Sequence, residues 1–530
     1  MRAISRRKFG KTVLSGMVAS RTFDAPLSSR GSTLKKPNIL FICSDQHSGP
    51  LLMGGPGEIV PVRTPNLKRL ARMGVHFKNA YCVDPVCTPS RASLMTGRFA
   101  SDVGSYCNST PFDGRVPTWG GYLRGAGYYT WATGKLDLSP KAAADFEQVH
   151  TSNGHYEHPD ITSLFRRPMC YRVDERRQID GKVEDRGGHD QRVLENGLGF
   201  LGREAKSVGK PWAAYLGFTM PHPPFGASQK YWDLYPPDQV RLPNVPPGYL
   251  EGLPLEFQVL RNFKMISTPV PEERIRRARS AYYGMITELD GRIGQLLDEL
   301  EKSGEIENTL VVYTSDHGEM LGEHGLWLKN NLLEGAARVP LIVAGAGLPR
   351  GMSIEAPVSH VDLVATLLDL AGVPTPGGLR GHSLLPTMRG SKMMHPGFVY
   401  AESNSEGNCT GSFMIRKGDW KYIYFSWYGD RLLFNLKQDP GEMNNLAGQT
   451  AHASKVRELH GLLTSVVDPD AVNEAAFRKQ RQVLIQMVQE KTPDEFFQTL
   501  RGRLGRGQAS ALTRKYYRDW QPGPANTAAR

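Results

Sequence analysis

Polar side chains stand where four apolar runs of the chain end. Asp45 follows NILFICS, Lys135 follows YYTWATG, His222 follows WAAYLGFTMP, and the pair Asp316-His317 follows NTLVVYTS. Continuous apolar runs of this length are typical of strands that are buried on both faces. Ligands of open α/β sheets bind beyond the carboxyl ends of the strands. We therefore expect these side chains to meet at one site.

A cysteine precedes a predicted helix start in the stretch DPVCTPSRASLMTGR at residues 84–98. Pro89 suits the first position of a helix, which places Cys87 near the positive helix end, and Arg91 follows one turn later. An anion is stabilised there by backbone N–H groups and the guanidinium. A thiolate would be reactive, but no cysteine-protease signature accompanies it. A core thiol and a disulfide with Cys82 are the alternatives.

The remaining candidate residues suggest a metal and an anion. Two aspartates with amide and imidazole neighbours suit a hard divalent cation with oxygen-rich ligands. Lysines and histidines around such a cation suit a multiply charged anion that is displaced at its central atom. The first group comprises Asp45, Gln46, Asp316 and His317, and the second comprises Lys135, His222 and Lys329.

The elements that must position these residues alternate between strands and helices. The clearest helical pattern covers residues 275–304, where apolar side chains recur every three or four positions until Gly304. This alternation predicts a doubly wound, mostly parallel sheet. Beyond residue 390, short alternating segments with turn signals predict a smaller α+β subdomain with an antiparallel sheet. We assign residues 37–390 to the catalytic domain, 391–470 to this subdomain and 471–530 to a basic helical extension.

Composition narrows the classes of function. The net charge of +12, from 65 Lys+Arg against 53 Asp+Glu, favours an anionic partner, which is a nucleic acid, an anionic lipid or a sulfated or carboxylated polymer, and charge alone does not choose among these. No apolar run approaches the roughly 20 residues that span a bilayer, so we expect no integral membrane segment. The six cysteines are too few and too scattered for a disulfide scaffold.

The N-terminus resembles an export signal. Ser5 to Lys11 read SRRKFGK, which matches the twin-arginine pattern, and a mildly apolar stretch, TVLSGMVAS, follows. The alternative is a basic tail without this role. We therefore expect residues 1–36 to be a leader and the protein to be exported, periplasmic or secreted, by the twin-arginine machinery of a bacterium.

The segment CTPSR at 87–91, continuing to LMTGR at 94–98, resembles the signature of type I sulfatases in the alkaline phosphatase superfamily. The similarity covers about 37–470 and depends on blocks in a fixed order. These blocks are PNILFICSDQ at 37–46, TGK at 133–135, PHPP at 221–224, SDHGE at 315–319 and LFNLKQDPGEMNNLA at 433–447. The resemblance implies an alkaline-phosphatase-like fold and hydrolysis of a sulfate ester.

The resemblance also implies a role for each site residue. A maturation enzyme would oxidise Cys87 to formylglycine, whose hydrate is the nucleophile in this family. The metal ligands would be Asp45, Asp316, His317 and Gln46, together with residue 87. Arg91 and Lys135 would orient residue 87. His222, Lys329 and Lys135 would bind the sulfate, with His222 and Lys329 assisting the leaving oxygen.

Three positions depart from the commonest family pattern. Gln46 stands where many members have a second aspartate, His317 where many have asparagine, and Asp137 where many have histidine. The family favours Ca²⁺, while an imidazole ligand leaves room for Mn²⁺ or Mg²⁺. For the missing histidine, another histidine or Asp137 itself could compensate. We interpret His155, with His150, His158, His189 and His382, as a surface or loop residue.

The variant GKLD at 134–137, together with the block YTSDHGEMLGEHGLWLKN, is similar to the arylsulfatase K branch, whose activity is that of a glucuronate-2-sulfatase. This implies a sulfated saccharide from glycosaminoglycan as the substrate, and no nucleic acid as a partner. Two alternatives remain. One is a phosphonate monoester or phosphodiester hydrolase of the same superfamily, and the other is a glycan-binding pseudo-sulfatase without catalysis.

Overall fold

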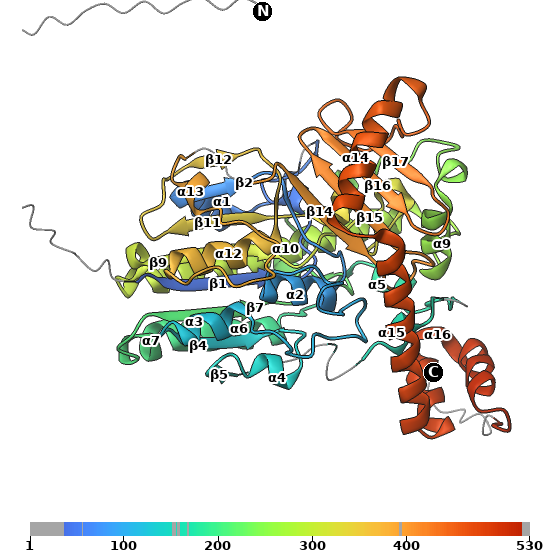
Figure 1. The fold of residues 1–530 in the computed structure, drawn as a ribbon, viewed down its shortest axis with the longest axis horizontal. Coiled ribbons are helices and arrows are strands. Elements are labelled where there is room, and N and C mark those ends of the chain that lie inside the picture. Colours follow the sequence, from blue (N-terminus) through green and yellow to red (C-terminus); the bar gives the residue numbers. More distant parts are fainter. Residues whose placement is uncertain are drawn as a thin grey trace, which may run out of the picture. The chain divides into compact units, whose positions relative to one another are not determined.

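The computed structural model describes residues 36–55, 57–150, 155, 159–166, 169–391 and 395–521 (Figure 1). The predicted leader at 1–36 lies outside these residues except for Lys36. Among the described residues, no helix combines the length and the hydrophobicity that a membrane span requires. All six cysteines are buried free thiols, so the alternative of a disulfide between Cys82 and Cys87 is wrong.

An eight-stranded sheet forms the centre of the molecule (Figure 1). In spatial order its strands are β12 (Met352–Ile354), β2 (Gly74–Phe77), β11 (Leu341–Gly345), β9 (Thr309–Ser315), β1 (Asn38–Ser44), β7 (Trp212–Gly217), β4 (Tyr129–Gly134) and β5 (Gln148–Val149). Strands β9, β1, β7, β4 and β5 run parallel, whereas β11 is antiparallel to both β9 and β2. The predicted mostly parallel sheet is confirmed.

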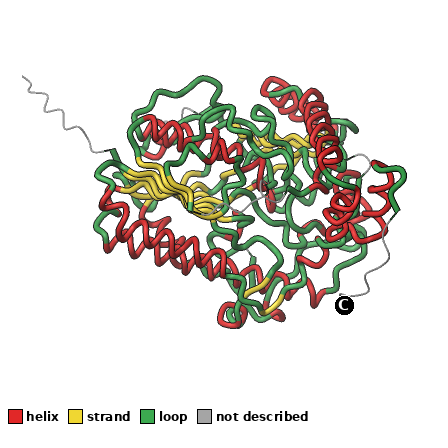
Figure 2. The backbone as a smooth tube through the Cα atoms, turned by 90° about the horizontal axis from the view of Figure 1, so that it is seen from below, coloured by secondary structure: helices red, strands yellow, loops and turns green. Residues whose placement is uncertain are grey.

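Helices cover both faces of this sheet (Figure 2). Leu40 and Ile42 of β1 share one apolar core with α1 (Pro65–Met73), α6 (Gly188–Gly199) and α10 (Glu272–Lys302). Ile39 and Phe41 point to the opposite core, which includes α2 (Cys87–Thr96), α3 (Trp119–Gly125) and α12 (His360–Leu370). The period of two along β1 thus distributes its side chains between two cores. Helix α10 confirms the helix predicted at 275–304, to within three residues.

A second, antiparallel sheet follows in the chain. Its strands are β14 (Phe398–Ser403), β15 (Ser412–Lys417), β16 (Trp420–Phe425) and β17 (Arg431–Asn435), joined in that order. Helix α14 (Ala453–Val466) packs against one face through Val456, Leu459 and Leu463. This confirms the predicted C-terminal antiparallel sheet. Two long helices complete the described chain, α15 (Pro469–Glu490) and α16 (Pro493–Tyr516), drawn in red in Figure 1.

Shorter elements fill the connections. Strands β3 (Ala80–Tyr81), β10 (Arg338–Val339) and β13 (Val358–Ser359) form a three-stranded sheet, and β6 (Lys182–Val183) pairs with β8 (Gly226–Ala227). The short helices are α4 (Pro140–Ala143), α5 (Glu175–Gln178), α7 (Ala205–Ser207), α8 (Gln229–Trp232), α9 (Leu255–Phe263), α11 (Glu334–Ala337) and α13 (Leu385–Met388).

A buried group of charges connects the second sheet to α11 and β3. Lys421 on β16 lies 3.0 Å from Glu334 and 2.8 Å from Glu442, and its side chain is fully buried. The Tyr81 hydroxyl donates to Glu334 at 3.0 Å and accepts from Arg416 at 3.2 Å. We call these five residues the Lys421 cluster. Every member finds an oppositely charged or hydrogen-bonding partner within it, as buried ionic groups require.

Candidate active site

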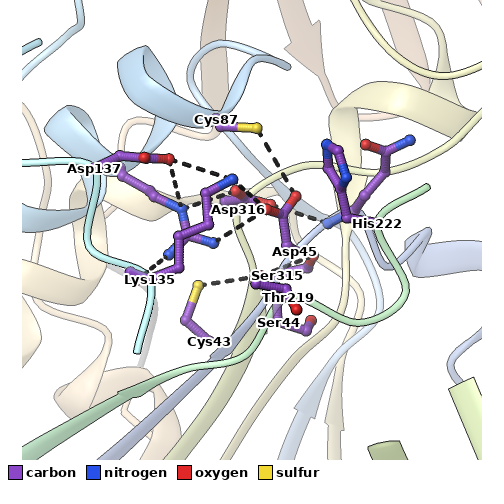
Figure 3. Close-up of polar contacts among 12 residues, drawn as sticks. Cys43, Ser44, Asp45, Cys87, Lys135, Asp137, Thr219, His222, Ser315 and Asp316 are labelled. Atoms are coloured by element: carbon purple, nitrogen blue, oxygen red, sulfur yellow. Dashed lines mark hydrogen bonds and ion pairs between the residues drawn. The ribbon is translucent and has the colours of Figure 1, made fainter. Parts of the chain in front are cut away.

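The carboxyl ends of the central strands bring most of the predicted residues together. Strands β1 and β9 pair in parallel with Ser44 opposite Ser315, so the residues that follow, Asp45 and Asp316, are neighbours. Lys135 follows β4 at the same edge, where its Nζ donates to Asp45 Oδ2 at 2.5 Å. Figure 3 shows Lys135 on one side of Asp45 and His222 on the other. The ends of these strands therefore bring the predicted side chains close together.

Two carboxylates, an imidazole and a thiol converge in this site. The Nε2 atom of His317 lies 3.6 Å from Asp45 Oδ1, 3.6 Å from Asp316 Oδ1 and 3.3 Å from Cys87 Sγ. One ligand atom from each of the four residues lies within 4.8 Å of the others, and all four residues are buried. This donor set fits a divalent cation that accepts carboxylate and imidazole ligands.

Arg91 joins the helix of Cys87 to the carboxylates. Its side chain is fully buried, and its Nε donates to Asp316 Oδ2 at 3.0 Å. Its Nη1 donates to the backbone oxygen of Lys135 and to the Tyr215 hydroxyl, both at 2.8 Å. Arg91 therefore holds α2 against the ends of β4 and β9. We call Asp45, Arg91, Lys135, Asp316 and His317 the site cluster.

Helix α2 places Cys87 at its first residue. The helix begins two residues earlier than predicted, so Pro89 is its third residue, where the missing N–H is still tolerated. All ten residues of α2 are buried. The structure contains the unmodified thiol, whose Sγ lies 3.9 Å from Asp45 Oδ1. A hydroxyl group carried by an oxidised residue 87 would take the place of this sulfur.

Lys329 and Gln46 also lie beside residue 87. Lys329 Nζ lies 3.0 Å from Cys87 Sγ and donates to Gln46 Oε1 at 2.8 Å. Gln46 Nε2 donates to Glu319 Oε2, which fixes the orientation of the amide and leaves Oε1 facing the site. His222 is half-buried, and its Nδ1 donates to the carbonyl of Pro223 at 2.6 Å, which leaves Nε2 as the acceptor.

The electrostatics are those of an anion site beside a carboxylate pair. Burial and the Cys87 thiol act to raise the pKa of Asp45, but Lys135, His222 and Lys329 hold it below its usual range. Burial and the charge of Asp45 raise the pKa of Asp316. Despite burial, Lys135, Lys329 and His317 hold the pKa of the Cys87 thiol well below its usual value. Negative charge at residue 87 is thus stabilised.

His155 is a site residue that the sequence interpretation missed. Side-chain ligand atoms of Cys87, Asp137 and His155 lie within 4.8 Å of one another. The carboxylate of Asp137 accepts from the backbone N–H of His155 at 2.7 Å and lies 3.4 Å from Lys135 Nζ. His155 thus lies beside residue 87. Many family members have a histidine at the position of Asp137, so His155 is the other histidine that could compensate for its absence. The surrounding segment, SNGHYEH, has no periodic pattern, so only the Asp137 departure hinted at it.

A pocket of about 680 Å³ opens onto this group, within the range of pockets that enclose small ligands. Gln46, His155, His222 and Lys329 line its inner end. The outer wall comes from the segment around α5 and from α16, and it includes Asp160, Arg172, Asp174, Arg177, Lys182 and Arg503.

Comparison with known proteins identifies the family. Residues 37–373 match the family model described as Sulfatase, and residues 322–468 match one described as N-sulphoglucosamine sulphohydrolase, C-terminal. The chain is 35% identical to choline-sulfatase of Rhizobium meliloti, covering 78% of this chain and 83% of the relative. It is 31% identical to arylsulfatase K of Danio rerio, covering 86% of this chain and 88% of the relative.

Solved structures share the fold. The phosphonate monoester hydrolase SpPMH from Silicibacter pomeroyi superposes with a TM-score of 0.68 at 27% identity, covering 81% of this chain and 94% of that one. A protein described as a 2-O GAG sulfatase superposes with a TM-score of 0.64 at 24% identity, covering 82% and 92%. The family match extends over more than half of the chain. The chain therefore belongs to the type I sulfatases of the alkaline phosphatase superfamily, which are sulfuric ester hydrolases.

Proposed function

We propose that the chain hydrolyses a sulfate ester on an anionic saccharide, such as a 2-O-sulfated uronate from glycosaminoglycan. The observation that carries this proposal is the make-up of the pocket. Its outer wall is polar and carries charges of both signs, and Phe225 is the only phenyl, phenol or indole side chain among the described lining residues. The basic side chains are Arg172, Arg177, Lys182 and Arg503, and the acidic ones are Asp160, Asp174, Glu175, Asp180 and Glu184. A quaternary ammonium substrate such as choline sulfate is bound best by several aromatic faces, so this lining favours a polar, charged sugar.

Two further observations support a saccharide. Arylsulfatase K of Danio rerio and of other vertebrates is similar to this chain over most of both lengths. The net charge of +12 raises the local concentration of a polyanion around the protein.

We propose that Asp45, Asp316 and His317 hold a divalent cation, with Gln46 and residue 87 as further ligands. Ca²⁺ suits the carboxylates, and Mn²⁺ or Mg²⁺ is compatible with the imidazole. When bound, the cation supplies positive charge that polarises the sulfate group. The fit is supported by the carboxylate pair, because burial and the charge of Asp45 raise the pKa of Asp316 even though Arg91 is paired with it.

The basic side chains of the site would position residue 87 and bind the sulfate group. Arg91 is fixed by three hydrogen bonds and orients α2, and Lys135 is held between Asp45 and Asp137. Lys329 and His222 line the pocket beside residue 87 and would bind the sulfate oxygens. Protonated at Nε2, His222 would donate a proton to the leaving oxygen.

We propose that Cys87 is oxidised to formylglycine by a maturation enzyme, because the thiol stands at the point where cations and ligand atoms converge. Addition of water to the aldehyde would give a hydrate, one hydroxyl of which would be the nucleophile. Mass spectrometry of the tryptic peptide NAYCVDPVCTPSR (79–91) from the native host tests this proposal. We expect a mass that corresponds to formylglycine at residue 87, and finding only unmodified cysteine would support the pseudo-sulfatase alternative.

Substrate class is tested by a panel of esters at equal enzyme concentration. We expect the largest kcat/KM for 2-sulfated uronate disaccharides, with lower values for choline sulfate, aryl sulfates and phosphonate monoesters. Activity confined to other sugar sulfates would contradict the uronate assignment. Preferential hydrolysis of choline sulfate would contradict the saccharide proposal as a whole.

A phosphonate monoester or phosphodiester hydrolase is the second candidate function. The 27% identity and TM-score of 0.68 to the phosphonate monoester hydrolase of Silicibacter pomeroyi favour it. Faster turnover of phosphonate monoesters than of every sulfate ester would make this the main activity.

We also propose that residues 1–36 direct export through the twin-arginine machinery and are removed from the mature protein. The segments 37–390, 391–470 and 471–530 are proposed as the catalytic domain, the α+β subdomain and the basic extension.

A further inference from the structure

The C-terminal extension reaches the substrate pocket. Arg503 on α16 lines the pocket that also contains His222 and Lys329, although more than 170 residues separate them in the chain. Its backbone oxygen accepts from the N–H of Val173 at 2.9 Å, which ties α16 to the segment that forms the outer wall. Helix α16 is therefore part of the pocket and is not merely a solvated basic helix.

A break in α16 sets this contact. Gly505 has a φ of 73°, a left-handed conformation that glycine adopts without strain, and it separates the two halves of the helix. Beyond the break, Gln508 exchanges two hydrogen bonds with the backbone of Tyr171, at 2.9 and 3.0 Å. Residues on both sides of the break thus contact 171–173, which fixes Arg503 at the pocket wall.

Two arginines on this wall differ in how many of their guanidinium N–H groups remain free to bind a ligand. Arg172 has a side chain that is only 3% exposed, and its Nε, Nη1 and Nη2 all donate to Asp160 or Asp174 at 2.7–2.8 Å. Arg503 has a side chain that is 34% exposed, and only its Nη1 is engaged, donating to Asp160 at 3.0 Å and lying 3.8 Å from Asp174 Oδ2. Among the described residues, Nε and Nη2 of Arg503 have no hydrogen-bond partner. These two atoms form the edge that binds a carboxylate through two parallel bonds.

Asp160 holds this guanidinium in place. It accepts hydrogen bonds from Thr162 N at 3.1 Å and from Arg172 at 2.8 Å, so its position is fixed before a ligand arrives. Three other acidic groups on the wall have a basic partner, since Asp174 and Glu175 pair with Arg172 and Asp180 pairs with Arg274, whereas Glu184 is exposed. The unpaired edge of Arg503 is thus a preorganised donor group facing the pocket.

We propose that Arg503 binds the carboxylate of the substrate sugar and so makes the enzyme selective for uronate-containing sulfate esters. This inference rests on the proposed saccharide substrate and gives the C-terminal extension a role in specificity. Arg503 is a specificity residue, because nothing in the structure places it against the reacting atoms.

The test compares two substrates that differ only in the carboxylate. Arg503→Ala is assayed on a 2-O-sulfated glucuronate disaccharide and on its carboxyl-reduced counterpart. We expect KM for the first substrate to rise by about 10- to 100-fold, as loss of a charge-assisted contact implies, and kcat/KM for the second to change by less than about threefold. Arg503→Lys should recover part of the affinity. Arg501→Ala is the matched control, because Arg501 is exposed on the same helix and does not line the pocket.

An equal loss on both substrates, or none on either, would overturn the inference while leaving the proposed function standing. A second measurement is independent of uronate turnover: the inhibition constant of free glucuronate against an aryl sulfate. We expect it to rise at least about tenfold in Arg503→Ala, and an unchanged constant would overturn the inference. Failure of the wild-type enzyme to hydrolyse any sulfated uronate would instead contradict the proposed substrate.

Discussion

The site cluster and the Lys421 cluster are both buried groups of charges, but their side chains are arranged differently. In the Lys421 cluster, one lysine lies between Glu334 and Glu442 and is paired with both, although the two glutamates also line a second pocket of about 360 Å³. In the site cluster, two aspartates and a histidine converge on one point, and their side chains adjoin a pocket through Lys329 and His222. Burial of charge alone therefore does not identify an active site. What distinguishes the site cluster is that carboxylate and imidazole ligand atoms converge on one point beside the Cys87 thiol.

The energetic consequences differ accordingly. Removing one charged partner from the Lys421 cluster leaves an uncompensated buried charge, which lowers the stability of the fold. Removing one ligand from the site cluster relieves repulsion between Asp45 and Asp316, but it also removes the affinity for a cation. We therefore expect substitutions in the site cluster to affect activity, and substitutions in the Lys421 cluster to affect folding.

The largest expected effect is that of Cys87→Ala. If residue 87 supplies the nucleophile, kcat for any sulfate ester should fall by roughly 10⁴-fold or more. Steady-state kinetics on an aryl sulfate measure this, with circular dichroism to confirm folding. Cys82→Ala is the matched control, since Cys82 is an equally buried thiol outside the site. Activity of the Cys87 variant within tenfold of the wild type would contradict the assignment.

The second prediction concerns the cation. Asp316→Asn should reduce metal affinity by about 10- to 100-fold or more and lower activity in parallel, because one of two carboxylate ligands is lost. Metal content by plasma mass spectrometry and Ca²⁺ titration by calorimetry measure it. Asp290→Asn serves as a control, because Asp290 is a buried aspartate that accepts hydrogen bonds from the start of α1. Unchanged metal content in Asp316→Asn would separate Asp316 from the metal site.

The third prediction tests the Lys421 cluster. Lys421→Met should lower the free energy of unfolding by about 3–5 kcal/mol, because Glu334 and Glu442 lose their shared countercharge. Denaturant unfolding measures this. Lys417→Met on the neighbouring strand removes an exposed pair with Glu458 and should cost at most about 1 kcal/mol. If the Lys421 variant lost activity per folded molecule without losing stability, the contrast between the clusters would fail.

The smallest effect is a change in pH dependence. Glu402 on β14 is fully buried, and burial raises the pKa of its carboxyl from 4.5 to about 7. Between these values the unfolded chain has released a proton that the folded chain retains, so stability falls as pH rises through this window. Glu402→Gln should flatten this fall by about 1–3 kcal/mol between pH 4.5 and 7. Unfolding at several pH values measures it, and Glu355→Gln, at an exposed site, is the control. An unchanged slope in Glu402→Gln would contradict the prediction.

Much of the framework could be predicted from the sequence because it is encoded locally. Apolar runs that end in Asp45, Lys135 and Asp316 reveal buried parallel strands, and parallel strands bring their ends to one edge. The periodicity of residues 275–304 predicts α10 for the same reason. The order of the sulfatase blocks supplied the remaining candidates, Lys329 and Gln46, which the strand pattern alone does not connect to the site.

What could not be predicted depends on contacts between distant segments. His155 reaches residue 87 from a segment without periodicity, and Glu319 is matched to Gln46 only through the folded loop. The contact of Gln508 with Tyr171 spans 337 residues, so no local pattern could connect α16 to the pocket. Gly505 is one of several glycines in this basic segment, and the sequence does not show that the helix is kinked at this one.

The complete burial of α2 has a consequence for the order of events in biosynthesis. All ten residues of α2 are buried, so the helix has no accessible surface to which another protein could bind. The Cys87 side chain is fully buried within it. The proposed modification of Cys87 would therefore require access to this stretch before α2 packs into the fold. If export carries the folded protein, both modification and folding must be finished in the cytoplasm. The time available for maturation then ends when α2 closes against β4 and β9.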